Sequence, residues 1–354
     1  MRTFGTLFSG GEGAGVGLQA AGLEHAWGIE YEPQIAAVAQ DNGFDVRVAD
    51  VRDVDYAALP RVDWLHASPS CKNASVANSG AIETQEDTEA AQAVCRALTA
   101  QEPQVFTLEN VWRYRAFKSF CLICDQIKRM GYFWDYTHEN AADYGVPQTR
   151  RRLILRASRR LLPHLPEPVP WVGWYAAIED LIPALPESQL APWQLARLPE
   201  ELRANVLLDS KNVNQEYGKV SHAPRAVLLD GNNGRTDTGA PTACAQDAPS
   251  FTLGSARSAQ HRAVLISKTA DKFGDGLRQS FELAQTIGAN EHGSKGVLSA
   301  RVVSMTPRAL ARFQSVPDSY WLPDKRTLAT KVIGNMVPPL MMQRIAENML
   351  EVLP

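Results

Sequence analysis

The stretch Phe8-Ser9-Gly10-Gly11-Glu12-Gly13-Ala14-Gly15 separates an apolar run at residues 3–8 from a helical pattern at residues 16–22. Small residues between a strand and a helix let the backbone approach a ligand, and the amide groups of the helix face it. Glu30 ends the next apolar run, where a carboxylate accepts hydrogen bonds from both hydroxyls of a ribose. Asp50 follows a third run, a position suited to holding an adenine amino group. This order of features predicts a nucleoside-containing ligand.

Strand-like and helix-like segments alternate around this stretch. Apolar runs lie at residues 3–8, 25–30, 46–49, 62–67, 105–108 and 153–155, and helical patterns at 16–22, from Pro33, at 86–98 and at 116–130. This alternation predicts an α/β fold with a doubly wound, mostly parallel sheet in residues 1–160. Prolines and polar turns dominate residues 161–297, which predicts a smaller, loop-rich domain. Residues 298–354 regain helical patterns at 306–314 and 345–352 and are expected to return to the first domain.

Composition sets broad limits on function. The 354 residues are 45% hydrophobic, enough for a large core. A net charge of -3 does not mark a general polyanion binder, so any nucleic-acid surface must be local, and the densest basic stretch is at residues 150–160. The five cysteines lack regular spacing, and we expect neither a signal sequence nor a membrane-spanning segment, because no apolar run is long enough for a bilayer. We expect a cytoplasmic protein without a membrane partner.

Cys71 is the candidate nucleophile. It lies in Ala67-Ser68-Pro69-Ser70-Cys71-Lys72-Asn73, directly after the run at 62–67, where open α/β sheets present their ligands. A free thiol with a pKa of about 8.5 is little ionised at neutral pH, so neighbouring positive charge, for which Lys72 is a candidate, favours the thiolate. Lone cysteines are more often small buried side chains, but these polar neighbours favour catalysis. Cys121 and Cys124 share a helical pattern, where we expect core packing and no metal site.

Glu109 and two arginines complete a set that suits cytosine. Glu109-Asn110-Val111 closes the run at 105–108, and Arg150 and Arg152 alternate on one face of the next. C5 of cytosine becomes nucleophilic only after a thiolate adds at C6 and an acid neutralises N3. A structural ion pair between Glu109 and an arginine gives the same pattern, and both interpretations can hold together. The residues therefore predict methyl transfer to C5 of cytosine.

The ordered motifs resemble the DNA cytosine-5 methyltransferase family. That family combines a glycine turn, a ribose-binding acid, a Pro-Cys nucleophile, Glu-Asn-Val, Gln-x-Arg-x-Arg, a variable target-recognition domain and Gly-Asn-x-Val-Pro. This chain matches them over residues 3–158 and 299–350, including Gly334-Asn335-Met336-Val337-Pro338. The resemblance implies a sheet of the S-adenosylmethionine-dependent methyltransferase type with a loop-rich target-recognition domain. It also implies S-adenosylmethionine as cofactor, double-stranded DNA as substrate, and Cys71, Glu109, Arg150 and Arg152 as catalytic residues.

The resemblance extends to binding residues. Those implied for the cofactor are Phe8, Ser9, Gly10, Gly13, Glu30, Tyr31, Asp50, Val51, Pro69, Asn335 and Val337. Those implied for DNA are Lys72, Asn73, Ser75, Gln148, Asn232, Asn233, Arg235, Thr252 and Arg257. A duplex hides C5 and C6 of cytosine in the base stack, so the reaction requires base flipping. Residues 72–86 are the candidate lid over the flipped base.

Four positions depart from the family pattern. Thr6 replaces an acid, Glu12 a glycine, Ser70 a proline and Ala309 a glutamate. A DNA-binding regulator that has lost turnover and a tRNA cytosine-5 methyltransferase are the alternatives, whereas a nicotinamide oxidoreductase leaves Cys71 and Glu109 without a role. We expect a monomer, with a cognate restriction endonuclease as a candidate partner.

Overall fold

The computed structural model describes most of the larger domain and parts of the smaller one. The described residues are 2–70, 73–74, 82–190, 192–196, 226–229, 243–245, 247–250, 252, 261–268 and 298–351. Several predicted site residues therefore lie outside the described residues: Cys71, Lys72, Ser75, Asn232, Asn233, Arg235 and Arg257.

Seven strands form the larger sheet, in the order β3-β2-β1-β4-β5-β7-β6. They are β1 Thr3–Leu7, β2 Glu24–Glu30, β3 Val46–Val48, β4 Trp64–Ala67, β5 Val105–Asn110, β6 Phe133–Asn140 and β7 Arg151–Ser158. The first five strands pair in parallel, and β7 runs antiparallel to both β5 and β6. The α/β class and the mostly parallel sheet are confirmed. One edge, called the carboxyl edge below, gathers the ends of β1, β2, β4, β5 and β6 with the start of β7.

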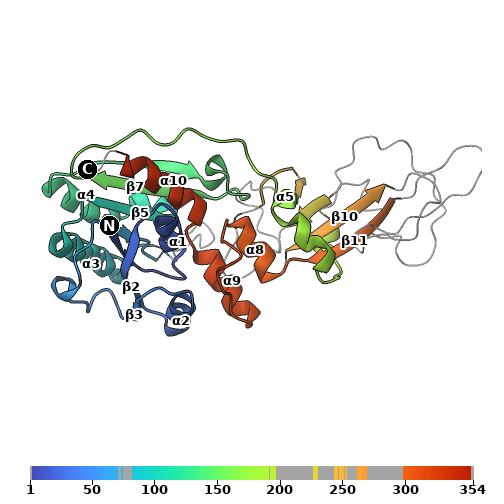
Figure 1. Cartoon of the computed structure of the whole chain (residues 1–354), viewed down its shortest axis with the longest axis horizontal. Helices are drawn as coiled ribbons and strands as arrows, with labels where there is room; N and C mark the ends of the chain where they lie inside the picture. Colours follow the sequence, from blue (N-terminus) through green and yellow to red (C-terminus); the bar gives the residue numbers. More distant parts are fainter. Residues whose placement is uncertain are drawn as a thin grey trace, which may run out of the picture.

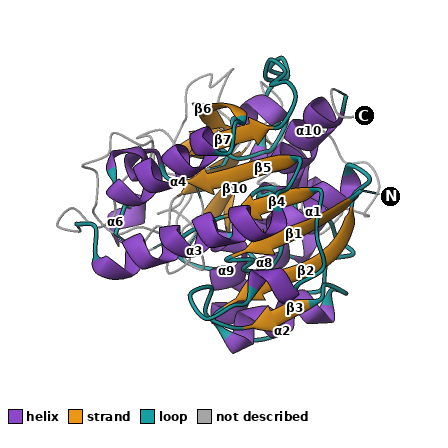
Figure 2. Ribbon diagram, turned by 90° about the vertical axis from the view of Figure 1, so that its left-hand side faces the viewer, coloured by secondary structure: helices purple, strands orange, loops and turns teal. Residues whose placement is uncertain are grey.

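Helices cover both faces of this sheet. They are α1 Gly13–Ala20, α2 Pro33–Asp41, α3 Gln85–Gln101, α4 Lys118–Arg129 and α10 Pro339–Leu350. Figure 2 shows α3 and α4 in front of the strands, where Leu65, Phe106 and Leu155 belong to the same buried core. A second core joins α1 and α10 to the opposite faces of β1 and β4. The sheet is therefore doubly wound.

Local sequence explains where these helices begin. Thr84 caps α3 by accepting a hydrogen bond from the Asp87 amide, and the Asp87 carboxylate accepts one from the Thr84 amide at 2.8 Å. Pro33 stands in the first turn of α2, where a missing amide hydrogen costs nothing. Short 3-10 helices join other elements: η1 Tyr56–Ala58, η2 Trp112–Ala116, η3 Ala141–Tyr144 and η4 Glu179–Ala184.

The smaller sheet is antiparallel, with the order β11-β10-β8-β9. Its strands are β8 Ala226–Leu229, β9 Ala243–Ala245, β10 Arg262–Lys268 and β11 Leu298–Ser304. The remaining helices are α5 Trp174–Ile178, α6 Pro192–Leu195, α8 Pro307–Phe313 and α9 Arg326–Asn335. Figure 1 shows α8 and α9 between the two sheets. Residues 298–304, the start of the predicted C-terminal segment, therefore pair within the smaller sheet.

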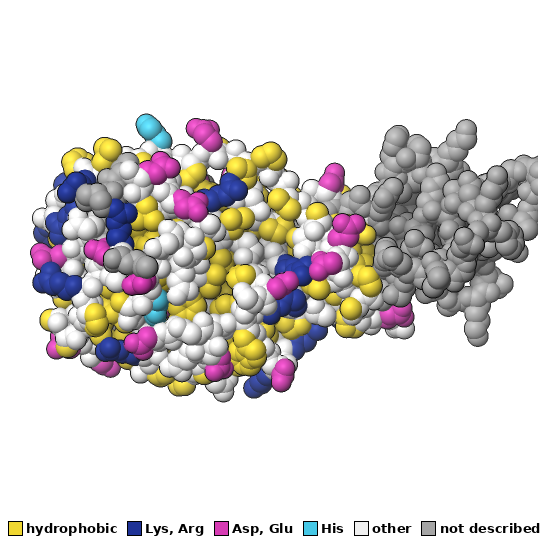
Figure 3. Space-filling view, viewed as in Figure 1, with side chains coloured by type: hydrophobic (Ala, Val, Ile, Leu, Met, Phe, Trp, Pro, Cys, Tyr) yellow, Lys and Arg dark blue, Asp and Glu magenta, His cyan; other side chains and the backbone are white. Residues whose placement is uncertain are grey.

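The chain returns to the larger domain after α9. A Cβ atom at Gly17 of α1 would lie 2.4 Å from the carbonyl oxygen of Pro339, so α10 packs directly against the backbone of α1. On the face shown in Figure 3, basic and acidic side chains are interspersed. Within the described ranges, every helix is too short or too polar to cross a bilayer.

Candidate active site

The glycine turn between β1 and α1 lies at the carboxyl edge. Phe8, Gly10 and Glu12 have φ angles of 57°, 56° and 57°. This left-handed conformation costs a non-glycine residue roughly 1–2 kcal/mol, and such strain is concentrated at functional turns. The Gly10 amide donates to Glu30 Oε2 at 2.8 Å, which ties the turn to the end of β2.

Glu30 has the surroundings expected of a ligand-binding acid. Its second oxygen, Oε1, accepts the Glu32 amide at 2.8 Å. Burial raises the pKa of Glu30 above its usual value, although both amide hydrogen bonds oppose the change. Tyr31, the next residue, is 69% exposed. A half-buried carboxylate beside an exposed aromatic ring suits a nucleoside, which offers hydroxyl groups and a planar base.

Asp50 and Val51 follow β3 as predicted. Hydrogen bonds from the Arg52 guanidinium hold the pKa of Asp50 below its usual value, and the closest joins Arg52 Nη2 to Asp50 Oδ2 at 2.7 Å. Val51 is buried. Asp50 is thus already ion-paired, a feature that the sequence pattern did not predict.

The C-terminal motif packs onto the glycine turn. A Cβ atom at Gly13 would lie 2.4 Å from the carbonyl oxygen of Val337, and one at Gly11 would lie 2.5 Å from a methyl carbon of Val332. Tyr320 also donates its hydroxyl to the Gly11 carbonyl at 2.7 Å. The structure therefore brings together two motifs that are more than 300 residues apart, as the hydrogen bond between residues 11 and 320 illustrates.

Asn335 ends α9 beside this contact and is exposed to solvent. The exposed amide side chain is thus available to a molecule bound at the turn. Ser9, also in the turn, shares a hydrogen bond with Thr6 between their hydroxyl groups at 2.7 Å.

Glu12 explains two departures from the family pattern at once. Its side chain is fully buried, and Thr6 Oγ1 donates a hydrogen bond to Glu12 Oε1. His25 Nε2 lies 3.4 Å from the same oxygen. The carboxylate of residue 12 therefore lies beside residue 6, the position at which the family usually carries an acid. A carboxylate is therefore present beside residue 6, although residue 12 supplies it.

Glu109 and Arg152 form the predicted acid and arginine pair. Glu109 is 7% exposed, and Arg152 Nε lies 3.0 Å from its Oε1. The N–H of Arg152 is not aligned with that oxygen, so Oε1 has no hydrogen bond from the described residues. Arg150, predicted to share this face, instead donates from Nη1 to the Gly334 carbonyl at 3.1 Å. In the described part of the chain, Arg152 therefore lies against Glu109, whereas Arg150 bonds to the C-terminal motif.

Asn110 connects the acid to the nucleophile segment. Its Nδ2 donates to the Pro69 carbonyl at 2.9 Å, and its Oδ1 accepts the Val111 amide at 2.8 Å. Pro69 is buried and precedes Cys71 by two residues in the sequence. The end of β5 is thus fixed to the segment that follows β4. Beyond that segment, Asn73 Nδ2 donates to Asp87 Oδ2 at 2.9 Å, which ties it to α3.

His66 is structural. Its two ring nitrogens lie 2.9 Å from the hydroxyl oxygens of Thr107 and Ser68. Burial lowers the pKa of His66 to about 3, so the ring is neutral at physiological pH. This agrees with the expectation that His66 packs at a strand end and does not act as a base.

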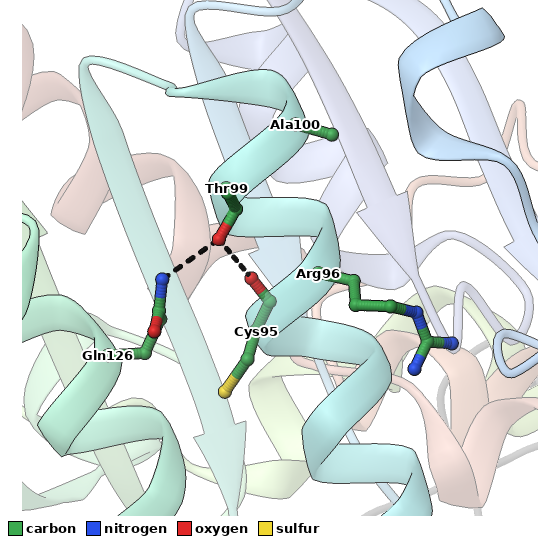
Figure 4. Close-up of a pocket in the computed structure, with 5 residues that line it drawn as sticks. All are labelled: Cys95, Arg96, Thr99, Ala100 and Gln126. Carbon is green, nitrogen blue, oxygen red and sulfur yellow. Dashed lines mark hydrogen bonds between the residues drawn. The ribbon is translucent and has the colours of Figure 1, made fainter.

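A shallow hollow between α3 and α4 contains another cysteine (Figure 4). There, Gln126 donates to the Thr99 hydroxyl at 2.9 Å, and that hydroxyl donates to the Cys95 carbonyl at 2.9 Å. Burial raises the pKa of Cys95 to about 11 and that of Cys124 to about 12, so both thiols are protonated at neutral pH. Cys121 is exposed on α4, so the expectation of core packing is wrong for this residue. No cluster of three metal-binding side chains exists among the described residues.

Gln148 lies where the two domains meet. The Thr149 amide donates to the Ser250 carbonyl at 2.8 Å, and Thr252 Oγ1 donates to the Thr149 carbonyl. The side chain of Gln148 is fully buried, and neither atom of its amide group has a partner among the described residues. A buried amide without partners costs about 1–3 kcal/mol.

Comparisons with known proteins agree with this geometry. A sequence model of the C-5 cytosine-specific DNA methylase family matches residues 2–351. Type II methyltransferase M1.HphI of Haemophilus parahaemolyticus is 24% identical over 99% of this chain and 87% of its own length. Type II methyltransferase M.HhaI of the same species is 24% identical over 97% of this chain and 92% of its own.

Solved structures show the same fold. The chain of the Entamoeba histolytica methyltransferase EhMeth superposes with a TM-score of 0.60 and 12% identity, covering 100% of this chain and 99% of its own. The S. pombe Dnmt2 methyltransferase superposes with a TM-score of 0.56 and 14% identity, with the same coverage. Because the family model spans nearly the whole sequence, the chain belongs to the C-5 cytosine-specific DNA methylase family and is a DNA cytosine-5 methyltransferase.

Proposed function

We propose that the protein transfers a methyl group from S-adenosylmethionine to C5 of a cytosine in double-stranded DNA, through attack of Cys71 on C6 of a flipped base. One observation carries this proposal. Glu109 is a buried acid at the carboxyl edge whose Oε1 has no hydrogen bond from the described residues, and Asn110 ties the same strand end to Pro69. Such an acid is suited to N3 of a cytosine ring.

The glycine turn suits S-adenosylmethionine. Glu30 would accept hydrogen bonds from the ribose hydroxyls, and the exposed ring of Tyr31 would pack against adenine. Asp50 would accept the adenine amino group while keeping its ion pair with Arg52. The remaining residues proposed to surround the cofactor are Phe8, Ser9, Gly10, Gly13, Val51, Pro69, Asn335 and Val337. When bound, the cofactor supplies an electrophilic methyl group to the carbon activated by the enzyme.

The protein's own residues activate that carbon. The Cys71 thiolate adds to C6 while Glu109 donates a proton or a hydrogen bond to N3, and the ring becomes an enamine with electron density at C5. Arg152 keeps Glu109 in place and compensates its charge whenever the acid is ionised. After methylation, loss of the C5 proton and of the thiolate restores the aromatic ring. Water takes this proton, because both nitrogens of His66 are already engaged.

The target base must leave the duplex to reach these groups. Flipping costs a few kcal/mol, which contacts to the rest of the DNA must repay. We propose that residues 72–86 close over the flipped cytosine, and that Gln148 and Thr252 contact DNA where the domains meet. By analogy with the Type II relatives, we also propose a role in restriction and modification beside a cognate endonuclease, in a monomeric, cytoplasmic enzyme.

Bisulfite sequencing of DNA from cells that express the protein tests this proposal. We expect 5-methylcytosine within one recognition sequence for the wild type and none for Cys71→Ser, although the variant still binds that sequence. Full activity of Cys71→Ser would refute the covalent mechanism. DNA binding by the wild type without methylation of DNA or tRNA would support a regulator of the same fold.

A further inference from the structure

A stacked aromatic and cationic cluster stands beside Glu109 and has no role in the mechanism above. Trp112 and His138 stack with ring centroids 4.5 Å apart and an angle of 16° between the planes. The guanidinium carbon of Arg115 lies 4.6 Å from the centroid of the Trp112 ring. Tyr136 and Phe120 extend the aromatic contacts to α4, with centroids 5.2 Å apart. We call Trp112, Arg115, His138 and the neighbouring Arg151 the rim cluster.

The topology places the rim cluster at the mouth of the active site. β5 and β6 both run antiparallel to β7, so their carboxyl ends lie at the same edge. Trp112 begins η2 directly after β5, and His138 lies near the end of β6. Arg151 begins β7, paired with Asn140, and its neighbour Arg152 is the residue that contacts Glu109.

The positive charge of the rim cluster is not balanced. Arg115 and Arg151 are exposed, and neither of them has an ion pair with a carboxylate among the described residues. Arg61 and Arg312, in contrast, are paired with the carboxylates of Glu102 and Asp180. This local excess of positive charge contrasts with the chain's net charge of -3.

Besides burial, the charges of these arginines affect the pKa of His138 within the rim cluster. Burial lowers the pKa of His138, and the nearby charges of Arg151, Arg115 and Arg152 lower it further, while Glu139 opposes them. Glu139 also accepts a hydrogen bond from the Tyr144 hydroxyl at 2.8 Å, which engages one of its oxygens away from the cluster. An anion bound beside these groups would therefore meet a positive potential.

We propose that the rim cluster grips a backbone phosphate of the DNA strand beside the flipped cytosine, with Trp112 as the rigid platform that holds Arg115 and His138 in place. The inference rests on the proposed function, because it takes the strand entering the Glu109 site as its ligand. Stacking against an aromatic ring restricts an arginine side chain, so less freedom is lost when it meets a phosphate. Phosphate contacts fix the position of DNA without reading its sequence. The rim cluster should therefore govern affinity and leave the recognition sequence unchanged.

Salt-dependent binding tests the proposal. We would measure the dissociation constant of a labelled duplex for the Arg115→Gln/Arg151→Gln variant over a range of salt concentrations. Each lost phosphate contact lowers the slope of log K against log salt by about 0.9, so we expect the slope to fall by about 1–2 and affinity at low salt to fall about tenfold or more. Arg61→Gln is the matched control, since Arg61 is exposed but lies before β4 at the opposite edge.

Two substitutions of Trp112 test its role as the platform for Arg115 and His138. Trp112→Ala leaves the charge unchanged but should weaken binding several-fold, whereas Trp112→Phe should retain most of the affinity. Thermal unfolding of each variant would show whether the fold is intact. If a folded Arg115→Gln/Arg151→Gln protein binds duplex DNA with the slope and affinity of Arg61→Gln, the rim cluster does not contact phosphate.

Two further outcomes separate this inference from the proposed function. If the wild type binds the duplex but methylates no cytosine, a lower slope in the double variant still supports the rim cluster while the catalytic proposal fails. If the double variant loses affinity for a structured RNA and not for duplex DNA, the assignment of the DNA strand is overturned.

Discussion

The carboxyl edge contains two sites that are held together by different means. At the β1–α1 turn, shape is set by the backbone, because Gly11 and Gly13 leave no room for side chains against the C-terminal motif. At the end of β5, function depends on individual charges, since Glu109 has Arg152 as its ion-pair partner. At the first site, Glu12 supplies a buried carboxylate beside Thr6. The second site should tolerate no exchange of its charged residues.

Glu109→Gln should have the largest effect. An amide of the same size cannot deliver a proton to N3, so we expect kcat to fall by about 10²–10⁴-fold. Binding of the recognition duplex should stay close to that of the wild type. Methyl transfer kinetics with a radiolabelled donor would measure the loss. Glu102→Gln, at an exposed carboxylate that pairs with Arg61, is the control and should retain full activity.

Gly13→Ala should have the second-largest effect, because it should lower the stability of the folded protein. Its Cβ would lie 2.4 Å from a backbone oxygen that has little freedom to move, and such overpacking costs about 1–3 kcal/mol. A Cβ atom at Gly10 would have no neighbour within 4 Å. In Gly10→Ala, however, the left-handed backbone with a φ of +56° would cost roughly 1–2 kcal/mol. Thermal unfolding with and without S-adenosylmethionine would compare the two variants. We expect cofactor stabilisation to be lost mainly in Gly13→Ala, and equal stabilisation of both variants would contradict the close packing.

An exchange between positions 6 and 12 would test the role of the Glu12 carboxylate. Glu12→Gly relieves the left-handed backbone but removes the carboxylate beside Thr6, so we expect the cofactor dissociation constant to rise about tenfold, or about 1.4 kcal/mol. Thr6→Asp/Glu12→Gly returns a carboxylate to position 6 and should recover most of that loss. Calorimetric titration would measure both constants. Equal affinities of the single and the double variant would show that this carboxylate does not support the turn.

The smallest effect should be a pH dependence of cofactor affinity that arises from Glu30. Burial raises its pKa, so the folded state holds the proton more tightly, and this group's contribution to stability is present below pH 4.5 and lost as pH rises through the raised pKa. Binding of ribose hydroxyls needs the ionised form, so cofactor affinity should fall as pH drops through the same range. Cofactor titrations of the wild type and Glu30→Gln at several pH values would show this, and a pH dependence unchanged in Glu30→Gln would exclude Glu30 as its source.

The sequence predicted the central strands well, for a physical reason. β1, β4 and β5 are covered on both faces, so each appears as a continuous apolar run. β6 was not predicted, because it is an edge strand in which the half-buried Trp134 and the exposed Tyr136 and His138 alternate with polar residues. α9 was not predicted either, since Thr and Lys interrupt its apolar pattern.

The smaller domain and parts of the site depend on contacts between distant residues. Residues 161–297 were predicted to be loop-rich, yet β8 and β10 pair across more than 30 residues of intervening chain. The burial of Glu12 could not be foreseen, because it needs a left-handed backbone at a residue that rarely adopts one. Likewise, alternation along a strand cannot tell that Arg150, before β7, bonds to Gly334 while Arg152 contacts Glu109.

Trapping of the covalent intermediate tests the central claim most directly. A duplex carrying 5-fluorocytosine at the target position blocks the last step, because fluorine cannot leave C5 as a proton does. In the presence of S-adenosylmethionine, intact mass spectrometry should find the wild type joined to the DNA strand through Cys71, and Cys71→Ser should form no adduct. A wild-type enzyme that methylates the normal duplex but is never trapped, or a Cys71→Ser protein that is trapped equally well, would contradict the account.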